Sequence, residues 1–139
     1  MVKSVIGAVV GALVWMFGFY ALAIGLSMVW PDYAIHGRQF VREGVFTFTA
    51  PMAWCNVLFW VLAGIAGGWV GAKIARRRVA VRVLAGLLGL YLAVLHLVLY
   101  WPRFPWWYNL AVVLSCVPAV LWGAKLANSV GIPSAEAAR

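Results

Sequence analysis

Residues 64–82 read GIAGGWVGAKIARRRVAVR, and this stretch decides the fold. It begins as an apolar helix with four glycines and ends in five cationic residues, before the next apolar run starts. Gly64, Gly67, Gly68 and Gly71 follow the spacing i, i+3, i+4 and i+7, so they share one helix face. Small residues on one face let helices approach closely in lipid, and cations beside a span hold that end in the cytoplasm. The stretch therefore predicts a membrane-spanning helix that packs through glycine.

The composition places the whole chain in a bilayer. Hydrophobic residues make up 66% of the 139 residues, charged residues make up 10%, and the mean hydropathy is +0.98. These values leave too little polar surface for a water-soluble domain. The net charge of +8 would suggest nucleic acid on a solvated domain. Here the cations lie between apolar runs, so cytoplasmic retention explains them and no nucleic-acid partner is expected.

Four apolar runs are long enough to cross the hydrocarbon core, which takes about 20 helical residues. They cover approximately residues 5–29, 52–72, 83–101 and 108–127. The expected fold class is an all-α integral membrane protein, with four transmembrane helices in a single membrane domain over residues 1–139. The remaining segments are expected to be an outer loop, a basic cytoplasmic loop and a flexible tail, at residues 30–51, 73–82 and 128–139.

The first run can also be read as a secretory signal peptide, because Lys3 precedes it and residues 21–23 fit a small-x-small cleavage site. Its 25 uncharged residues are too many for a typical signal core, so we interpret it as a retained span. Gly7 and Gly11 lie one helical turn apart near its start, and we expect them to form a second helix-packing site.

The loop between the first two spans carries charged and titratable side chains that we regard as candidate contacts for a partner. These are Asp32, His36, Arg38, Arg42 and Glu43. Acid–base chemistry by Asp32, His36 and Glu43 is the alternative interpretation. Asp32 and His36 are too few ligands for a metal, so no metal site is expected. Residues 45–49 alternate with period two, which predicts either a short strand or an interfacial segment.

Polar residues inside the spans form a second group of candidates. His96 lies about five residues before the end of the third span, so a structural histidine near the interface and a functional one both remain open. Asn56, Asn109, Ser27 and Ser115 reach similar depths and would complete a polar layer with it. No Asp or Glu lies inside a span, which argues against a carboxylate-based transport site.

The two halves of the chain share short motifs that suggest an internal repeat. Residues 54–56 (Trp-Cys-Asn) match residues 107–109 (Trp-Tyr-Asn), and residues 71–75 match residues 123–127. Both matched spans enter the membrane from the same side, so a duplication would give two parallel helical hairpins. Chance similarity between apolar helices is the alternative.

The cations also predict the orientation. Seven lie on one side of the membrane and three on the other, leaving Arg139 aside. The chain is therefore expected to be a multi-pass protein of a bacterial-type inner (plasma) membrane with both termini in the cytoplasm. Arg76, Arg77 and Arg78 are candidates for contact with anionic lipid headgroups.

No catalytic or cofactor motif accompanies these features. The sequence lacks a nucleophile elbow, a phosphate loop and a heme-attachment motif, and Cys55 and Cys116 lie in apolar runs where a thiol acts as a small hydrophobe. We expect no cofactor and no enzyme activity. The expected function is that of a small polytopic inner-membrane protein acting by helix packing with itself or a membrane partner, as an accessory subunit or immunity-type protein. The alternative is a small permease or channel subunit, working as an oligomer with His96, Asn56 and Asn109 along its path.

Overall fold

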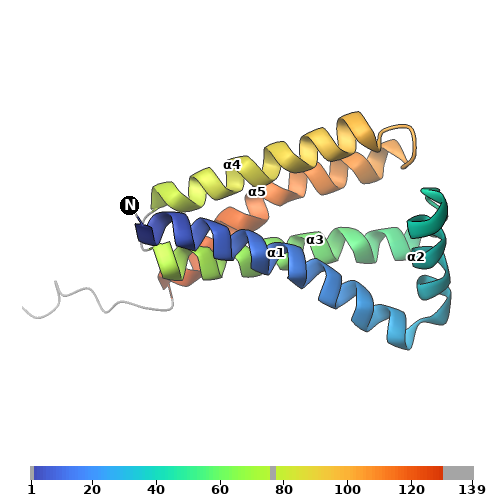
Figure 1. Ribbon diagram of the computed structural model, residues 1–139, viewed down its shortest axis with the longest axis horizontal. Helices are drawn as coiled ribbons and strands as arrows, with labels where there is room; N and C mark the ends of the chain where they lie inside the picture. The colour runs from blue at the N-terminus through green and yellow to red at the C-terminus, as the bar shows by residue number, and fades with distance from the viewer. Residues whose placement is uncertain (1, 76–77, 130–139) are drawn as a thin grey trace, which may run out of the picture.

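The computed structural model describes residues 2–75 and 78–129, with Arg78 by its backbone alone, and every regular element in this part of the chain is helical (Figure 1). In chain order these are α1 (Val2–Val29), α2 (Pro31–Glu43), α3 (Ala50–Ala75), α4 (Arg78–Val94), the π-helical turn η1 (Leu95–Leu99) and α5 (Trp106–Ser129). Within these described ranges, four helices, with α4 and η1 counted as one, are long and apolar enough to cross a membrane. The predicted all-α class with four spans is confirmed.

The boundaries of the predicted loops need correction. The basic loop expected at residues 73–82 is mostly helical, since α3 continues to Ala75 and α4 begins at Arg78. Lys and Arg favour helix and can extend long stems from the bilayer edge to water, so a span can continue through them. Helix α5 likewise reaches Ser129. Residues 76–77 and 130–139, which include the rest of the expected tail, lie outside the described residues.

The loop between the first two spans contains α2, a helix that the sequence analysis did not predict. Pro31 occupies its first turn, after the extended residue Trp30, and Asp32 adds an acidic side chain near the helix N-terminus. The helix ends at Gly44, whose φ of 68° is left-handed and whose N–H donates to the carbonyl oxygen of Phe40 at 2.8 Å. Helix α2 crosses the ends of the spanning helices (Figure 1), and we call this end of the bundle the α2 end.

The segment after α2 leads back into the membrane without regular structure. Residues 45–49 form no strand, so of the two alternatives for this segment the strand is excluded and the interfacial segment remains. The rings of Phe46 and Phe48 lie 5.3 Å apart, and Phe46 also packs edge-on against Phe104 at 4.9 Å. Aromatic packing, not strand pairing, therefore fixes this segment.

Helix α3 meets α1 through glycines on both helices. A Cβ added at Gly67 would lie 2.6 Å from the carbonyl oxygen of Gly11. One added at Gly7 would lie 2.8 Å from the carbonyl oxygen of Gly71. Real Cβ atoms do not approach backbone oxygens this closely, so the contact requires glycine.

Helix α3 meets α5 through the other two glycines of its face. A Cβ at Gly64 would lie 2.9 Å from the Cβ of Ala119, and one at Gly68 would overlap the carbonyl oxygen of Val120. Gly123 of α5 makes the reciprocal approach to the carbonyl oxygen of Ile65. The four-glycine face of α3 is thus divided between two neighbours within the same chain.

The motifs of the suggested repeat lie side by side. Helices α3 and α5 both run away from the α2 end (Figure 1), and the rings of Trp54 and Trp107 stack at 5.2 Å with an interplanar angle of 28°. These tryptophans begin the two matched motifs. Equivalent positions of the two halves therefore contact each other at the α2 end.

Helix α1 separates from α3 toward the α2 end (Figure 1). A Cβ at Gly11 would lie 2.8 Å from an α3 backbone oxygen, whereas one at Gly18 would lie 3.5 Å from the Cβ of Ala63. One at Gly25 would meet nothing within 4 Å. Close packing at one end of α1 thus gives way to looser packing toward the end that leads into α2.

Candidate functional site

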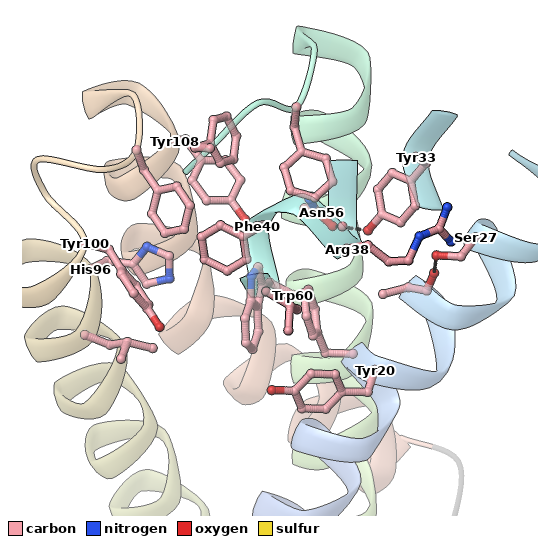
Figure 2. A pocket seen from close by; sticks show the side chains of 18 of the residues that line it. Tyr20, Ser27, Tyr33, Arg38, Phe40, Asn56, Trp60, His96, Tyr100 and Tyr108 are labelled. Carbon is pink, nitrogen blue, oxygen red and sulfur yellow. Dashed lines mark hydrogen bonds between the residues drawn. The ribbon is translucent and has the colours of Figure 1, made fainter. Parts of the chain in front are cut away.

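A cavity of about 670 Å³ occupies the space where α1 separates from the bundle and α2 crosses over it (Figure 2). Its lining comes from every helix described above, from residues 46–48 and from the connection between η1 and α5: Phe19, Tyr20, Ala23, Ser27, Tyr33, Ala34, Gly37, Arg38, Phe40, Val41, Arg42, Phe46, Phe48, Asn56, Trp60, Tyr91, Leu95, His96, Tyr100, Phe104 and Tyr108. Eleven of these 21 residues are Phe, Tyr or Trp. The volume and the mainly apolar lining are typical of a site for a small organic molecule.

Stacked aromatic rings form the floor of the cavity toward the centre of the bundle. The rings of Phe19 and Trp60 stack at 3.9 Å with an interplanar angle of 14°. Trp60 also packs on Trp15 at 4.9 Å, and Trp15 is 4% exposed. Leu88 and Leu92 of α4 are also buried in the core. The floor is therefore closed by large side chains.

Phe104 organises the wall on the α5 side. Its ring lies 5.3 Å from that of Phe40 on α2, 5.0 Å from Tyr100 and 5.4 Å from Tyr108. The turn that places it is held by the Phe104 N–H, which donates to the carbonyl oxygen of Tyr100 at 3.0 Å. One ring thus joins α2 to the connection between the third and fourth spans.

Two tyrosines mark a side opening of the cavity. Tyr20 on α1 and Tyr91 on α4 line the cavity, yet they are 57% and 54% exposed. Tyr20 lies nine residues before the end of α1, which is roughly 13 Å along a helix. The opening is therefore in the flank of the bundle, between two apolar helices, and not only at the end that carries α2.

His96 enters the cavity from a distorted part of the third span. The N–H of Tyr100 donates to the carbonyl oxygen of Leu95 at 2.9 Å, an i to i+5 hydrogen bond that defines the π-helical turn η1. Such turns are rare and frequently occur at functional sites. The imidazole is 3% exposed and lies almost parallel to the ring of Phe104, at 5.7 Å and 28°. Figure 2 shows it projecting toward Phe40 and the cavity interior.

Asn109 fixes the tautomer of His96. The Nδ2 of Asn109 donates to the carbonyl oxygen of Phe104 at 3.4 Å, which orients the amide so that its Oδ1 faces the imidazole. The Nδ1 of His96 lies 3.0 Å from this Oδ1. An amide oxygen only accepts hydrogen bonds, so Nδ1 carries the proton and donates it. In the neutral ring, Nε2 is then an acceptor.

Tyr33 and Asn56 join α2 to α3. The hydroxyl of Tyr33 donates to Oδ1 of Asn56, and both side chains are buried. Burial raises the pKa of Tyr33 to about 12. Figure 2 shows this pair above the cavity, on the side nearer to Arg38.

Helix α2 contributes two cations and open space. Arg38 and Arg42 line the cavity, and no carboxylate is among its lining residues in the described chain. Gly37, which directly precedes Arg38 in the middle of α2, also lines the cavity, and a Cβ added there would meet nothing within 4 Å. The end of the cavity under α2 therefore carries positive charge and has room for a polar group.

The other predicted residues of α2 belong to a separate network. The hydroxyl of Thr47 donates to Oε1 of Gln39 at 3.2 Å and accepts from Nδ1 of His36 at 2.8 Å. Gln39 in turn donates to Glu43 at 3.2 Å. Asp32 is exposed and takes no part in these bonds. The described residues contain no group of three or more His, Cys, Asp or Glu side chains that could hold a metal ion.

The expected polar layer separates into pairs. His96 pairs with Asn109, and Asn56 pairs with Tyr33. The hydroxyl of Ser115 donates to the carbonyl oxygen of Val112 at 3.1 Å, and that of Ser27 to the carbonyl oxygen of Ala23 at 2.8 Å, so each serine bonds within its own helix. The lipid-contact candidates Arg76, Arg77 and the side chain of Arg78 lie outside the described residues.

The aromatic residues of the cavity were not predicted as site residues. Trp60 was the available signal, because it lies ten residues inside α3, far from the interfacial belt that tryptophan prefers. It also follows Asn56 by one helical turn, so both share a face of α3. Comparisons with protein-family models, with curated proteins and with solved structures give no match to this chain.

Proposed function

We propose that this chain is a non-enzymatic binding protein of the inner (plasma) membrane, which takes an amphipathic small molecule from the bilayer into the aromatic cavity under α2. The observation that carries the proposal is the cavity itself, with its volume of about 670 Å³, its aromatic walls and the exposed lining residues Tyr20 and Tyr91 in the flank of the bundle. A molecule dissolved in the bilayer reaches a flank opening without crossing water. The cavity therefore suits a ligand that is already in the membrane.

The distribution of polar groups supports an amphipathic ligand. The floor and walls present mainly rings, whereas Arg38 and Arg42 stand at the α2 end without a carboxylate among the described lining residues. Cations near the membrane surface attract anionic or strongly polar groups. A ligand with an apolar body and a polar or anionic head would place the body against Trp60 and the head near the arginines.

Binding accounts for the cavity better than permeation does. A permeation path would have to continue past Trp60 toward the other end of the bundle. Trp15, which is 4% exposed, packs against Trp60 on that side, and glycine contacts between helix backbones follow farther along α3. The acid–base alternative rested on Asp32, His36 and Glu43, but none of these three residues lines the cavity, and His36 bonds to Thr47.

The hypothesis that the glycine faces pack against a partner is weakened, because these glycines are already in contact with helices of the same chain. The predicted packing glycines make their close approaches within this chain: Gly7, Gly11, Gly64, Gly67, Gly68 and Gly71. A membrane partner or a second copy would have to use other surfaces, such as exposed Trp101 and Trp106 at the α2 end.

The orientation follows from the positive-inside rule. Lys3, Lys73, Arg82 and Lys125 belong to one end of the bundle, and Arg38, Arg42 and Arg103 to the α2 end. With the arginine run at residues 76–78, seven cations stand against three. We propose that both termini are cytoplasmic and that the cavity opens in the outer half of the bilayer.

The test compares two glycines with open surroundings. A Cβ at either Gly37 or Gly25 would meet nothing within 4 Å, but only Gly37 lines the cavity. Gly37→Phe should therefore fill the cavity and leave the helix packing intact, and Gly25→Phe is the matched control on the surface of α1. Each protein is purified in mild detergent, and co-purified small molecules are extracted and identified by mass spectrometry.

We expect an amphipathic molecule to be enriched with the natural protein and with Gly25→Phe. Its amount per protein should fall by at least about tenfold with Gly37→Phe, which corresponds to about 1.4 kcal/mol of lost binding free energy. If all three proteins carry the same molecules in the same amounts, the cavity is not a binding site and the proposal fails.

A further inference from the structure

The acceptor atom of His96 indicates which ligands the cavity prefers, and this inference rests on the proposed function. Nδ1 donates to Asn109, so Nε2 of the neutral ring carries a lone pair. Within the described part of the chain, Nε2 has no hydrogen-bond partner, and it is not a fully sealed atom such as the unpaired Nε1 of Trp15. His96 as a whole is 97% buried but lines the cavity, so this acceptor faces the ligand space.

The surroundings of Nε2 favour an aromatic partner. The His96 ring lies 5.9 Å from the ring of Tyr100 and 6.0 Å from that of Tyr108, in addition to its contact with Phe104. Rings pack well on rings in offset or edge-on arrangements. A planar ring in the cavity would therefore find both aromatic walls and a hydrogen-bond acceptor at one edge.

We propose that the cavity selects ligands with a hydroxylated aromatic ring, and that Nε2 of His96 accepts the hydrogen bond of the ring hydroxyl. A phenolic O–H supplies the donor that this acceptor lacks. An ether or carbonyl in the same place would set one lone pair against another and would leave Nε2 desolvated without a partner. The class is therefore phenols and hydroquinone-type amphiphiles, as opposed to their ethers or quinones.

A matched pair of probes tests this selection. 4-Nonylphenol and 4-nonylanisole share the ring and alkyl tail, but only the phenol has an O–H. Binding of each is measured as a function of its mole fraction in phosphatidylcholine nanodiscs that contain the protein. We expect the phenol to bind at least about tenfold more tightly, a ratio consistent with leaving a buried acceptor unpaired.

Two variants assign this difference to His96. His96→Phe keeps a ring of similar size and removes the acceptor, and the double variant His96→Phe/Asn109→Leu also removes the amide that the first change leaves unpaired. Both should bind the two probes equally, provided that near-ultraviolet circular dichroism shows native packing. A preference for the phenol that survives in either folded variant would overturn the proposal.

A spectroscopic measurement on the natural protein does not depend on the folding of any variant. In protein with ¹⁵N-labelled histidine, the Nε2 resonance of His96 should be that of an unprotonated nitrogen and should shift when 4-nonylphenol is added, but not with 4-nonylanisole. His36→Gln assigns the second histidine. A protonated Nε2 in the free protein, or equal shifts with both probes, would contradict the proposal.

The outcomes separate this inference from the proposed function. If both probes bind equally and Gly37→Phe abolishes both, the cavity binds ligands but His96 does not select them, so this inference falls alone. If neither probe binds to the natural protein, the selection proposed here is wrong. The proposed function is then tested separately, by comparing the molecules that co-purify with Gly37→Phe and with Gly25→Phe.

Discussion

The Nδ1 of His96 and the Oδ1 of Asn109 lie 3.0 Å apart, and this hydrogen bond joins the end of the third span to the start of the fourth. The π-helical turn at Leu95–Leu99 brings the imidazole to this position, and the amide is oriented in turn by the carbonyl oxygen of Phe104. These two hydrogen bonds cross the aromatic wall of the cavity and determine which nitrogen of His96 faces the interior.

Removing the amide should destabilise the fold. In Asn109→Leu, the buried Nδ1–H of His96 loses its acceptor, and we expect a loss of about 1–3 kcal/mol in unfolding free energy. Ser115→Ala, in the same helix, is the control, because the Ser115 hydroxyl bonds only to the carbonyl oxygen of Val112 in its own helix. Reversible unfolding in mixed detergent micelles measures both. Equal stability of Asn109→Leu and the natural protein would show that the pair contributes nothing.

Substitutions on the glycine face of α3 should act on the fold of the single chain. A side chain at Gly68 would overlap the carbonyl oxygen of Val120, so Gly68→Leu should destabilise by more than the 1–3 kcal/mol typical of an overpacked core. Gly86→Leu is the control, because a Cβ there would meet nothing within 4 Å. Thermal unfolding followed by near-ultraviolet circular dichroism compares them. If both variants unfold at the same temperature, α3 and α5 do not pack as described.

The Tyr33–Asn56 hydrogen bond should give stability that depends on alkaline pH. Burial raises the pKa of Tyr33 to about 12 from the ordinary 10.0, so the folded state favours the protonated hydroxyl. The resulting stability is fully present below pH 10 and is lost as the pH rises through 12. Tyr33→Phe should therefore be less stable than the natural protein near pH 8, and the difference should shrink between pH 10 and 12. A difference that stays constant over this range would contradict the prediction.

The proposed orientation places α2 outside the cytoplasm. In a background of Cys55→Ala and Cys116→Ala, we expect Arg42→Cys to react with a membrane-impermeant maleimide in intact cells. Lys125→Cys, at the other end of the bundle, should react only after the membrane is permeabilised. Both parent residues are exposed, so burial does not explain a difference. The reverse labelling pattern would invert the topology.

Hydropathy and residue spacing were sufficient to predict the four spans, because apolar length is a property of each segment alone. They did not reveal α2. Its start and stop signals, Pro31 and Gly44, were visible, but its 13 residues are too short and too polar for a span. The glycines of α3 were predicted to pack. Which neighbour each one meets depends on the arrangement of three helices, and no single segment encodes that arrangement.

The cavity was beyond prediction from sequence for a related reason. It arises because α1 is held close to α3 at Gly7 and Gly11 and lies farther from it at Gly18, and its walls combine residues far apart in the chain. His96, Asn56 and Asn109 were recognised as polar residues at a similar depth. His96 pairs with Asn109, whereas Asn56 pairs with Tyr33. The second pair could not be predicted without the position of α2, which supplies Tyr33.

Photolabelling in the membrane tests the central claim most directly. A long-chain phenol with a diazirine on its tail is added to membranes that contain the protein, and the labelled residues are mapped by mass spectrometry. We predict labels on cavity residues that are not exposed on the bundle surface, above all Trp60, Phe46 and His96, and the loss of these labels in Gly37→Phe. Labels confined to lipid-facing residues such as Leu13, Leu87 and Leu90, with none in the cavity, would contradict the account.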